Sequence, residues 1–269
     1  MYFCCPKCGG PLTKKENSVL CDNGHCYDIS RRGYINLLGG SAVRHGDDGL
    51  MLTARRNILG GGYYDIFSSS LCDIAAEYIT DDKDLILDCG CGEGFYTTAL
   101  GGRFSGNPIC AFDVSKKAVT MACSLAHSRR TQIDFAVASS NAIPLPDNIV
   151  KILTNIFSPM AHTEFHRVLT SGGYMIYAVP GKRHLIELKE LIYGSVYENT
   201  FEEVLYPGFT LEKRIPVCGS VVFDSSSLTD LFRMTPYYYR SPRGSEERLS
   251  HCGKTEVTLC FDFLVYRKI

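Results

Sequence analysis

Short apolar runs alternate with amphipathic stretches through the middle of the chain. The apolar runs predict five strands, at residues 85–89, 108–113, 133–138, 149–155 and 174–179. Helical spacing follows in the stretches that begin at residues 95 and 116 and in residues 163–169, and Gly172-Gly173 predicts a turn. Strands that alternate with helices are typical of a parallel sheet covered on both faces. The pattern therefore predicts a doubly wound α/β sheet.

The flanks of this region divide the chain into predicted parts. Helical patterns at 50–59 and 64–79 precede the first strand, and a helix at 225–232 and a strand at 258–266 follow the last. Residues 1–38 contain cysteines, turn residues and two brief extended runs, and so small a module needs a metal or another cross-link to fold. Residues 39–49 are rich in glycine, serine and charge, which is typical of a linker. We therefore expect a module at 1–38, a linker at 39–49 and one domain at 50–269.

Composition narrows the class of protein without identifying it. The chain is 45% hydrophobic and 21% charged, and no apolar run approaches the roughly 20 residues that a membrane span requires. The 13 cysteines, with no apolar signal segment before them, indicate a cytoplasmic protein whose thiols are reduced and partly metal-bound. The net charge of the whole chain is −1, so global charge does not predict a nucleic-acid partner.

The first cysteine cluster has the spacing of a structural zinc site. Two residues separate Cys5 from Cys8 and three separate Cys21 from His25, and zinc takes four such ligands in a tetrahedron. Binding contributes roughly 10–16 kcal/mol, enough to fold a module of this size. Two alternatives remain open at this point, because Cys4 could replace Cys5 as a ligand and Cys26 could replace His25.

A second cluster lies in a glycine-rich turn between the first predicted strand of the domain and the helix after it. Its candidate cofactor-binding residues are Asp88, Gly90, Gly92, Glu93 and Gly94. Phe95 stands where a dinucleotide fingerprint has its third glycine, and a P-loop lysine is missing. Asp113 ends the next strand, where an acid can bind ribose hydroxyls. We interpret the turn as a nucleotide-like cofactor site and Cys89 and Cys91 as small residues within it.

The glycines, the acids and the strand order together resemble the class I S-adenosylmethionine-dependent methyltransferases. In that family the glycine turn approaches the amino-acid end of the cofactor and the acid at Asp113 holds the ribose. Ser139, followed by Ser140, stands where many members have the acid that binds adenine. A serine hydroxyl accepts a hydrogen bond more weakly than a carboxylate.

Over nearly its full length the chain is similar to the bacterial 23S ribosomal RNA guanine-N1-methyltransferases. The motifs that carry this resemblance are the zinc pattern with GYINLL behind it, ARRNILGGGYYD, DCGCGEGFYT, NIFSP, EFHRVL, PGKRHLIELKELIY and RMTPYYYR. The resemblance implies a homodimer that methylates a guanine in a hairpin loop of large-subunit RNA. It also implies zinc ligands at Cys5, Cys8, Cys21 and His25, and cofactor contacts at Tyr64, Gly92, Glu93 and His184.

Acceptor-side residues are candidates from chemistry alone. Guanine N1 must lose a proton, and Asp47, Asp48 and Asn155 are candidates to accept it. Phe157 could stack on a looped-out base. The candidates for phosphate contacts are Arg31, Arg32, Arg55, Arg56, Lys182 and Arg183.

Two other functions stay open at this stage. A small-molecule methyltransferase would share the glycine turn, because substrate recognition is grafted onto a common fold. An RNA-binding or resistance-associated protein that has lost catalysis would share the zinc module, and Ser139 would suit it. The zinc module and the paired basic residues argue against the first, and the intact glycine turn with Asp113 argues against the second.

Overall fold

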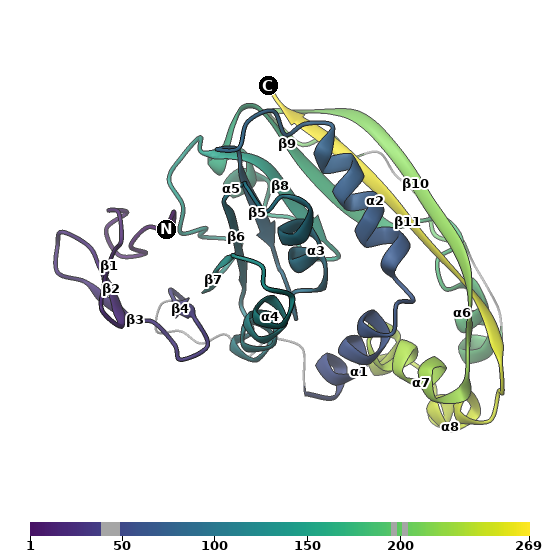
Figure 1. Ribbon diagram of the computed structural model, residues 1–269. Coiled ribbons are helices and arrows are strands. Elements are labelled where there is room, and N and C mark those ends of the chain that lie inside the picture. Colours follow the sequence, from purple (N-terminus) through teal and green to yellow (C-terminus); the bar gives the residue numbers. More distant parts are fainter. Residues whose placement is uncertain (39–48, 195–197, 201–203) are drawn as a thin grey trace.

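The computed structural model describes residues 1–38, 49–194, 198–200 and 204–269, and an eight-stranded sheet forms its centre (Figure 1). The strand order is β10-β11-β9-β8-β5-β6-β7-β4. The strands are β4 (Tyr34–Asn36), β5 (Leu85–Cys89), β6 (Ile109–Asp113), β7 (Asp134–Val137), β8 (Val150–Ile156), β9 (Leu169–Pro180), β10 (Phe209–Phe223) and β11 (Thr255–Lys268). Strands β4 to β9 pair in parallel, and β11 and β10 pair antiparallel. The predicted doubly wound α/β fold is confirmed, with an antiparallel edge.

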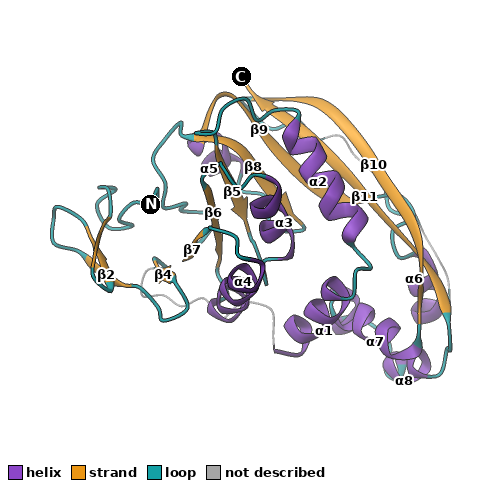
Figure 2. Cartoon of the chain, viewed as in Figure 1, coloured by secondary structure: helices purple, strands orange, loops and turns teal. Residues whose placement is uncertain are grey.

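Helices pack along this sheet (Figure 2). They are α1 (Gly49–Gly60), α2 (Asp65–Ala76), α3 (Phe95–Arg103), α4 (Lys116–Arg129), α5 (His162–Val168), α6 (Ile186–Tyr193), α7 (Ser225–Arg233), α8 (Ser245–Ser250) and the 3₁₀ helix η1 (Pro236–Tyr239). Helices α1, α7 and α8 lie together at one end of the molecule (Figure 2). Helix α1 lies beside α7, where Asn57 donates a hydrogen bond to Asp230 over 2.8 Å. None of the helices in the described ranges combines the length and the apolar character that a bilayer span requires.

Burial of apolar strand residues explains why the central strands form. All five residues of β5 are buried, as expected for a parallel strand between two helical layers. Phe67 on α2 stacks on Phe261 of β11 with 3.9 Å between ring centroids. Each large apolar side chain buried in this way stabilises the fold by about 1.5–3 kcal/mol. The core therefore fixes the carboxyl ends of β5, β6 and β8, from which the candidate site is built.

The N-terminal module contains a small antiparallel sheet of β1 (Thr13–Lys15), β2 (Ser18–Leu20) and β3 (Cys26–Asp28). It lies at the end of the molecule away from α7 and α8 (Figure 1). Strand β4 falls within the predicted module yet pairs with β7 at the edge of the large sheet. The module is therefore joined to the domain by strand pairing. Nearly all of the predicted linker lies outside the described residues, and Gly49 begins α1.

Two features of the sheet differ from expectation. Gly172 and Gly173 do not end a strand, because β9 runs through them and its pairing with β8 shifts register between Val150 and Ile152. Residues 170–173 of β9 stand opposite Lys151 alone, and Gly172 has a φ of +69° within this irregularity. The second feature is β10, whose 15 residues carried no strand prediction. It pairs with β11 and widens the sheet by one strand at its edge.

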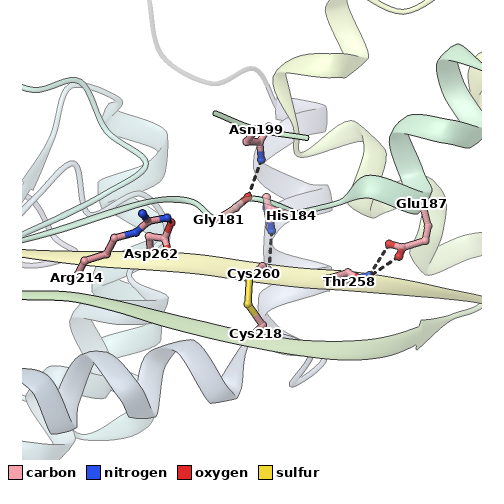
Figure 3. Close-up of a disulfide and its surroundings, with 9 residues drawn as sticks. All are labelled: Gly181, His184, Glu187, Asn199, Arg214, Cys218, Thr258, Cys260 and Asp262. Atoms are coloured by element: carbon pink, nitrogen blue, oxygen red, sulfur yellow. Dashed lines mark hydrogen bonds and ion pairs between the residues drawn. A yellow bond between two sulfur atoms is a disulfide. The ribbon is translucent and has the colours of Figure 1, made fainter. Parts of the chain in front are cut away.

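The expectation of reduced thiols is wrong for one pair of cysteines. Cys218 on β10 stands directly opposite Cys260 on β11, and their sulfurs form a disulfide (Figure 3). Side chains directly opposite each other in an antiparallel pair have Cβ atoms only about 4.5–5.5 Å apart. The register of the two strands therefore brings these sulfurs together, although 42 residues separate them in sequence.

Candidate metal, cofactor and acceptor sites

Four side chains of the N-terminal module converge on one point. The ligand atoms of Cys5, Cys8, Cys21 and His25 all lie within 4.8 Å of one another. The Cys8 and Cys21 sulfurs are 3.6 Å apart, and His25 Nδ1 lies 3.4 Å from Cys5 Sγ and 3.3 Å from Cys21 Sγ. Zinc bonds of about 2.3 Å to sulfur and 2.0–2.1 Å to nitrogen give tetrahedral edges of about 3.5–3.8 Å. The donor set therefore fits one zinc ion.

Tight turns hold these ligands in position. The Gly9 amide donates to the Cys5 carbonyl over 2.8 Å, and the Gly24 amide donates to the Cys21 carbonyl over 2.9 Å. Both glycines have positive φ, +70° and +78°, which a residue with a side chain rarely adopts. Burial raises the pKa of the Cys5 thiol, but hydrogen bonds from the Tyr27 hydroxyl and from backbone amides outweigh it and bring the pKa to about 6. These contacts favour the thiolate that binds metal.

The two alternative ligands lie outside this cluster. The Cys4 amide donates to the Pro144 carbonyl over 2.8 Å, so this part of the chain is held against the domain. Cys26 is exposed at the start of β3. Neither belongs to the group of four convergent ligand atoms, so the geometry favours Cys5 and His25.

Each glycine of the turn after β5 makes room for a different neighbour. A Cβ on Gly90 would overlap the Ser158 hydroxyl, and a Cβ on Gly94 would lie 2.9 Å from Cα of Ala122 on α4. A Cβ on Gly92 would lie 3.7 Å from Arg55 Nη1, so the guanidinium of α1 faces this part of the turn. The backbone of the turn at Gly92 therefore has no side chain on the side that faces α1.

The two acids of the motif have different surroundings. Asp88 is buried and accepts hydrogen bonds from the hydroxyls of Thr97, at 2.5 Å, and Thr154, at 2.8 Å. Burial raises its pKa, although the two hydrogen bonds lower it in part. These two contacts make the carboxyl an internal brace for the turn. Asp113 accepts from the amides of Gly92, at 3.0 Å, and Ser115, at 2.8 Å. It lies at the carboxyl end of β6, where the predicted ribose contact requires it.

The buried hydroxyl of Tyr64 indicates that a polar ligand belongs near the turn. The side chain is 2% exposed, and its hydroxyl has no hydrogen-bond partner among the residues that the structure describes. Buried polar groups are nearly always paired, so an unpaired one calls for an explanation. Glu93, also buried, lies in the turn itself. Tyr64 and the turn therefore fit a cofactor that brings a polar group.

His184 lies in the segment that connects β9 to α6. Its side chain is only 7% exposed, so it is not an ordinary surface histidine. Its Nδ1 accepts a hydrogen bond from the Cys260 amide over 3.1 Å (Figure 3). Burial, and after it the charge of Lys189, lowers the pKa of His184 to about 3. The neutral ring therefore carries its proton on Nε2 and is a hydrogen-bond donor there.

The loop after β8 places Phe157 above this histidine. The two rings are stacked with 6.0 Å between centroids, and Phe157 is 46% exposed. Its φ of +53° lies in the left-handed region, which costs about 1–2 kcal/mol for a residue with a side chain. Such strain at an exposed aromatic ring is typical of functional loops.

Asn155 does not act as a base in this arrangement. Its side chain is buried, accepts from the Ser158 amide over 3.2 Å and donates to the Pro159 carbonyl over 3.3 Å. An amide engaged on both sides holds the loop and cannot accept a proton. The other two candidate bases, Asp47 and Asp48, lie outside the described residues.

The remaining predicted residues are dispersed around the site. Ser139 and Ser140 follow β7 beside Asp113, and the Ser139 hydroxyl accepts from the Asn141 amide. Lys182 and Arg183 are exposed and both approach Glu198, at 3.0 and 3.7 Å. The exposed arginines that could reach phosphate are Arg31, Arg32 and Arg56, whereas Arg55 is half-buried.

Sequence reasoning missed Ser158, Thr97 and Thr154 as parts of the site. Ser158 follows Phe157 within the NIFSP motif, which offered a signal for it. Thr97 ends the motif DCGCGEGFYT, which offered the same kind of signal, whereas Thr154 lies outside the motifs and only the folded sheet brings it to Asp88.

Comparison with known proteins agrees with this geometry. Residues 3–41 match the profile of the family described as "RlmA, N-terminal", a zinc ribbon, and residues 86–173 match that of the "Methyltransferase domain" family. The chain is 35% identical over 202 residues to a Micromonospora griseorubida protein assigned as a 23S rRNA (guanine-N(1)-)-methyltransferase, covering 68% of this chain and 67% of that protein.

Two further relatives align over almost the entire chain. The 23S rRNA (guanine(748)-N(1))-methyltransferase of Streptomyces fradiae is 29% identical, with 100% of this chain and 97% of the relative covered. A Bacillus subtilis protein, YxjB, assigned as a 23S rRNA (guanine-N(1)-)-methyltransferase, is 30% identical, with 99% and 97% covered. This chain is a methyltransferase and belongs to the family of 23S rRNA (guanine-N1)-methyltransferases.

Proposed function

We propose that this protein transfers a methyl group from S-adenosylmethionine to N1 of a guanine in a hairpin loop of 23S ribosomal RNA. The observation that carries the proposal is the contact between the two halves of the site. Ser158, in the loop that presents Phe157, lies where a side chain on Gly90 would be. The surface that could hold an acceptor base therefore adjoins the turn that could hold the cofactor.

The chain's own contribution to catalysis would be positioning. Bound S-adenosylmethionine supplies an electrophilic methyl group on a positively charged sulfur. Gly92 leaves its backbone uncovered toward the amino-acid end of the cofactor, and Asp113 would hold the ribose. Alignment of acceptor and methyl group in a pocket with little water lowers the barrier without a covalent step on the protein.

Phe157 would hold the acceptor guanine by stacking. Its exposed ring is fixed from below by His184 and meets Phe261 edge-on, with 4.5 Å between ring centroids. A base that is flipped out of an RNA loop can stack on such a ring in place of its neighbouring bases. His184 would supply a donor through Nε2 and would not act as the base, because its pKa is about 3.

The family resemblance further supports a homodimer that acts in the cytoplasm, and we include both in the proposal. Sedimentation or light scattering of the purified protein would measure the oligomeric state. A monomer at micromolar concentration would contradict that part alone.

Methyl transfer to unmodified 23S rRNA fragments tests the function. We expect label from S-adenosylmethionine in one hairpin guanine and a primer-extension stop there, since N1 methylation blocks Watson–Crick pairing. The guanine equivalent to 748 is the first position to examine, because one relative is named for it. Cofactor binding without RNA methylation would refute the proposal and favour a small-molecule substrate, and no cofactor binding at all would favour an inactive RNA-binding protein.

A pair of variants separates base stacking from folding. Phe157→Ala should lower kcat/KM for the RNA roughly 10- to 100-fold, since one stacked base contributes about 1–3 kcal/mol. Phe157→Tyr keeps the ring and should retain most of the activity. Calorimetry with S-adenosylhomocysteine should give the same affinity for both. Equal activity of the alanine variant and the wild type would show that Phe157 is only a packing residue.

A further inference from the structure

Helix α1 places one arginine against the glycine turn and its neighbour in solvent. A Cβ on Gly92 would come within 3.7 Å of Arg55 Nη1, so the guanidinium occupies the space next to that bare backbone. Arg55 is half-buried, whereas Arg56 is exposed. An arginine that reaches RNA phosphate would be expected on the exposed side of the helix. The placement of Arg55 instead directs its charge at the pocket.

The groups around Arg55 are mostly acids and phenols. Glu93 is 6% exposed in the turn, and Asp113 binds the Gly92 amide. Burial raises the pKa values of the Tyr64 and Tyr96 phenols, and the charge of Arg55 lies close enough to both to lower them in part. The positively charged guanidinium of Arg55 therefore lies among carboxylates and phenols.

The amino-acid end of S-adenosylmethionine carries an ammonium group and a carboxylate. Acids and backbone carbonyls of the turn can bind the ammonium group. The carboxylate requires donors, and a guanidinium presents two parallel N–H groups that match its two oxygens. The Tyr64 hydroxyl, which has no partner among the described residues and is buried beside Phe67 and Phe261, can donate a further hydrogen bond.

We propose that Arg55, together with the hydroxyl of Tyr64, binds the carboxylate of the cofactor's methionine moiety. The proposal rests on the proposed function, because it assumes this cofactor, and it replaces the expectation that Arg55 contacts phosphate. Arg55 thus becomes a residue that selects cofactors with an intact amino-acid end.

Two ligands that differ in that end test the proposal. S-adenosylhomocysteine carries the carboxylate, whereas 5′-deoxy-5′-methylthioadenosine lacks the whole amino-acid moiety. For Arg55→Gln, calorimetry should show the affinity for S-adenosylhomocysteine reduced roughly 10- to 100-fold, as loss of a charge-assisted bidentate contact predicts. The affinity for methylthioadenosine should stay within about twofold, which also reports that the pocket is folded.

Arg56→Gln is the matched control on the same helix, and it should leave both affinities unchanged. Unchanged S-adenosylhomocysteine binding by Arg55→Gln, with weaker RNA binding and a smaller salt dependence, would overturn the proposal in favour of a phosphate contact. An equal loss for both ligands would also overturn it, because Arg55 would then only support the pocket. If the wild type binds neither ligand, the proposed function itself fails.

Discussion

His184 should make the folded protein sensitive to mild acid. Its folded-state pKa is about 3, against an ordinary value of 6.5, because burial excludes the charged ring. Below pH 6.5 the unfolded chain binds a proton at this position and the folded chain does not. Stability that is present above pH 6.5 is therefore lost progressively as the pH falls toward 3.

The size of the effect between pH 7 and pH 5 is about 2 kcal/mol. In this interval the loss depends on the pKa of the unfolded chain, provided that the folded value lies well below 5. The loss of stability is therefore the same for any folded-state pKa well below 5. Replacement by asparagine removes the titrating ring and keeps an acceptor near the position of Nδ1 for the Cys260 amide.

Urea unfolding of the wild type and of His184→Asn at both pH values measures this loss. The chain has no tryptophan, so far-ultraviolet circular dichroism is the suitable signal. Carboxylates and the zinc ligands titrate in both proteins and cancel in the comparison. We expect the wild type to lose about 2 kcal/mol more than the variant. Equal losses would show that the folded protein accepts the proton, and the reasoning about His184 would be wrong.

Two further predictions concern the turn and the metal. Gly94→Ala should destabilise the protein by roughly 2 kcal/mol or more, because φ is +90° and the new Cβ would lie 2.9 Å from Cα of Ala122. Urea unfolding measures this, and Gly102→Ala, with open space around its Cβ in α3, should stabilise by roughly 0.5–1 kcal/mol. If both substitutions have the same effect, close packing at the turn is refuted. Cys8→Ser should reduce bound zinc from one ion per chain to nearly none in elemental analysis, whereas Cys26→Ser should keep it. Zinc loss in the second variant would assign Cys26 as a ligand.

Local signals predicted the parts of the fold that local interactions determine. The apolar run at Leu85–Cys89, which follows charged residues and precedes Gly90, is a buried parallel strand because both its faces meet helices. The cysteine spacing in the first module reflects backbone turns at Gly9 and Gly24, which only a few sequences permit. The signals for both features lie within a few positions of each other, so they can be recognised directly in the sequence.

Long-range pairing determined the parts that the sequence did not show. Strand β10 contains Pro216 and Gly219, which argue against a strand, but Pro216 is tolerated because β10 lies at the edge of the sheet. Strand β4 has only three residues, and its pairing with β7 joins positions about a hundred residues apart. The burial of His184 likewise depends on the rings of Phe157, which follows β8, and Phe261, which lies in the middle of β11.

The glycine turn shows why a local motif can predict a site and still leave its chemistry open. Gly90 is small because Ser158 of the acceptor-side loop lies there, and Gly94 because α4 passes close by. Gly92 is small in front of Arg55, which α1 supplies from before the first strand of the domain. The motif itself therefore specifies a left-handed backbone at three positions and space beside them. The segments that approach this space decide which cofactor end and which acceptor can meet there, and in this chain they bring a guanidinium, a buried phenol and an exposed aromatic ring.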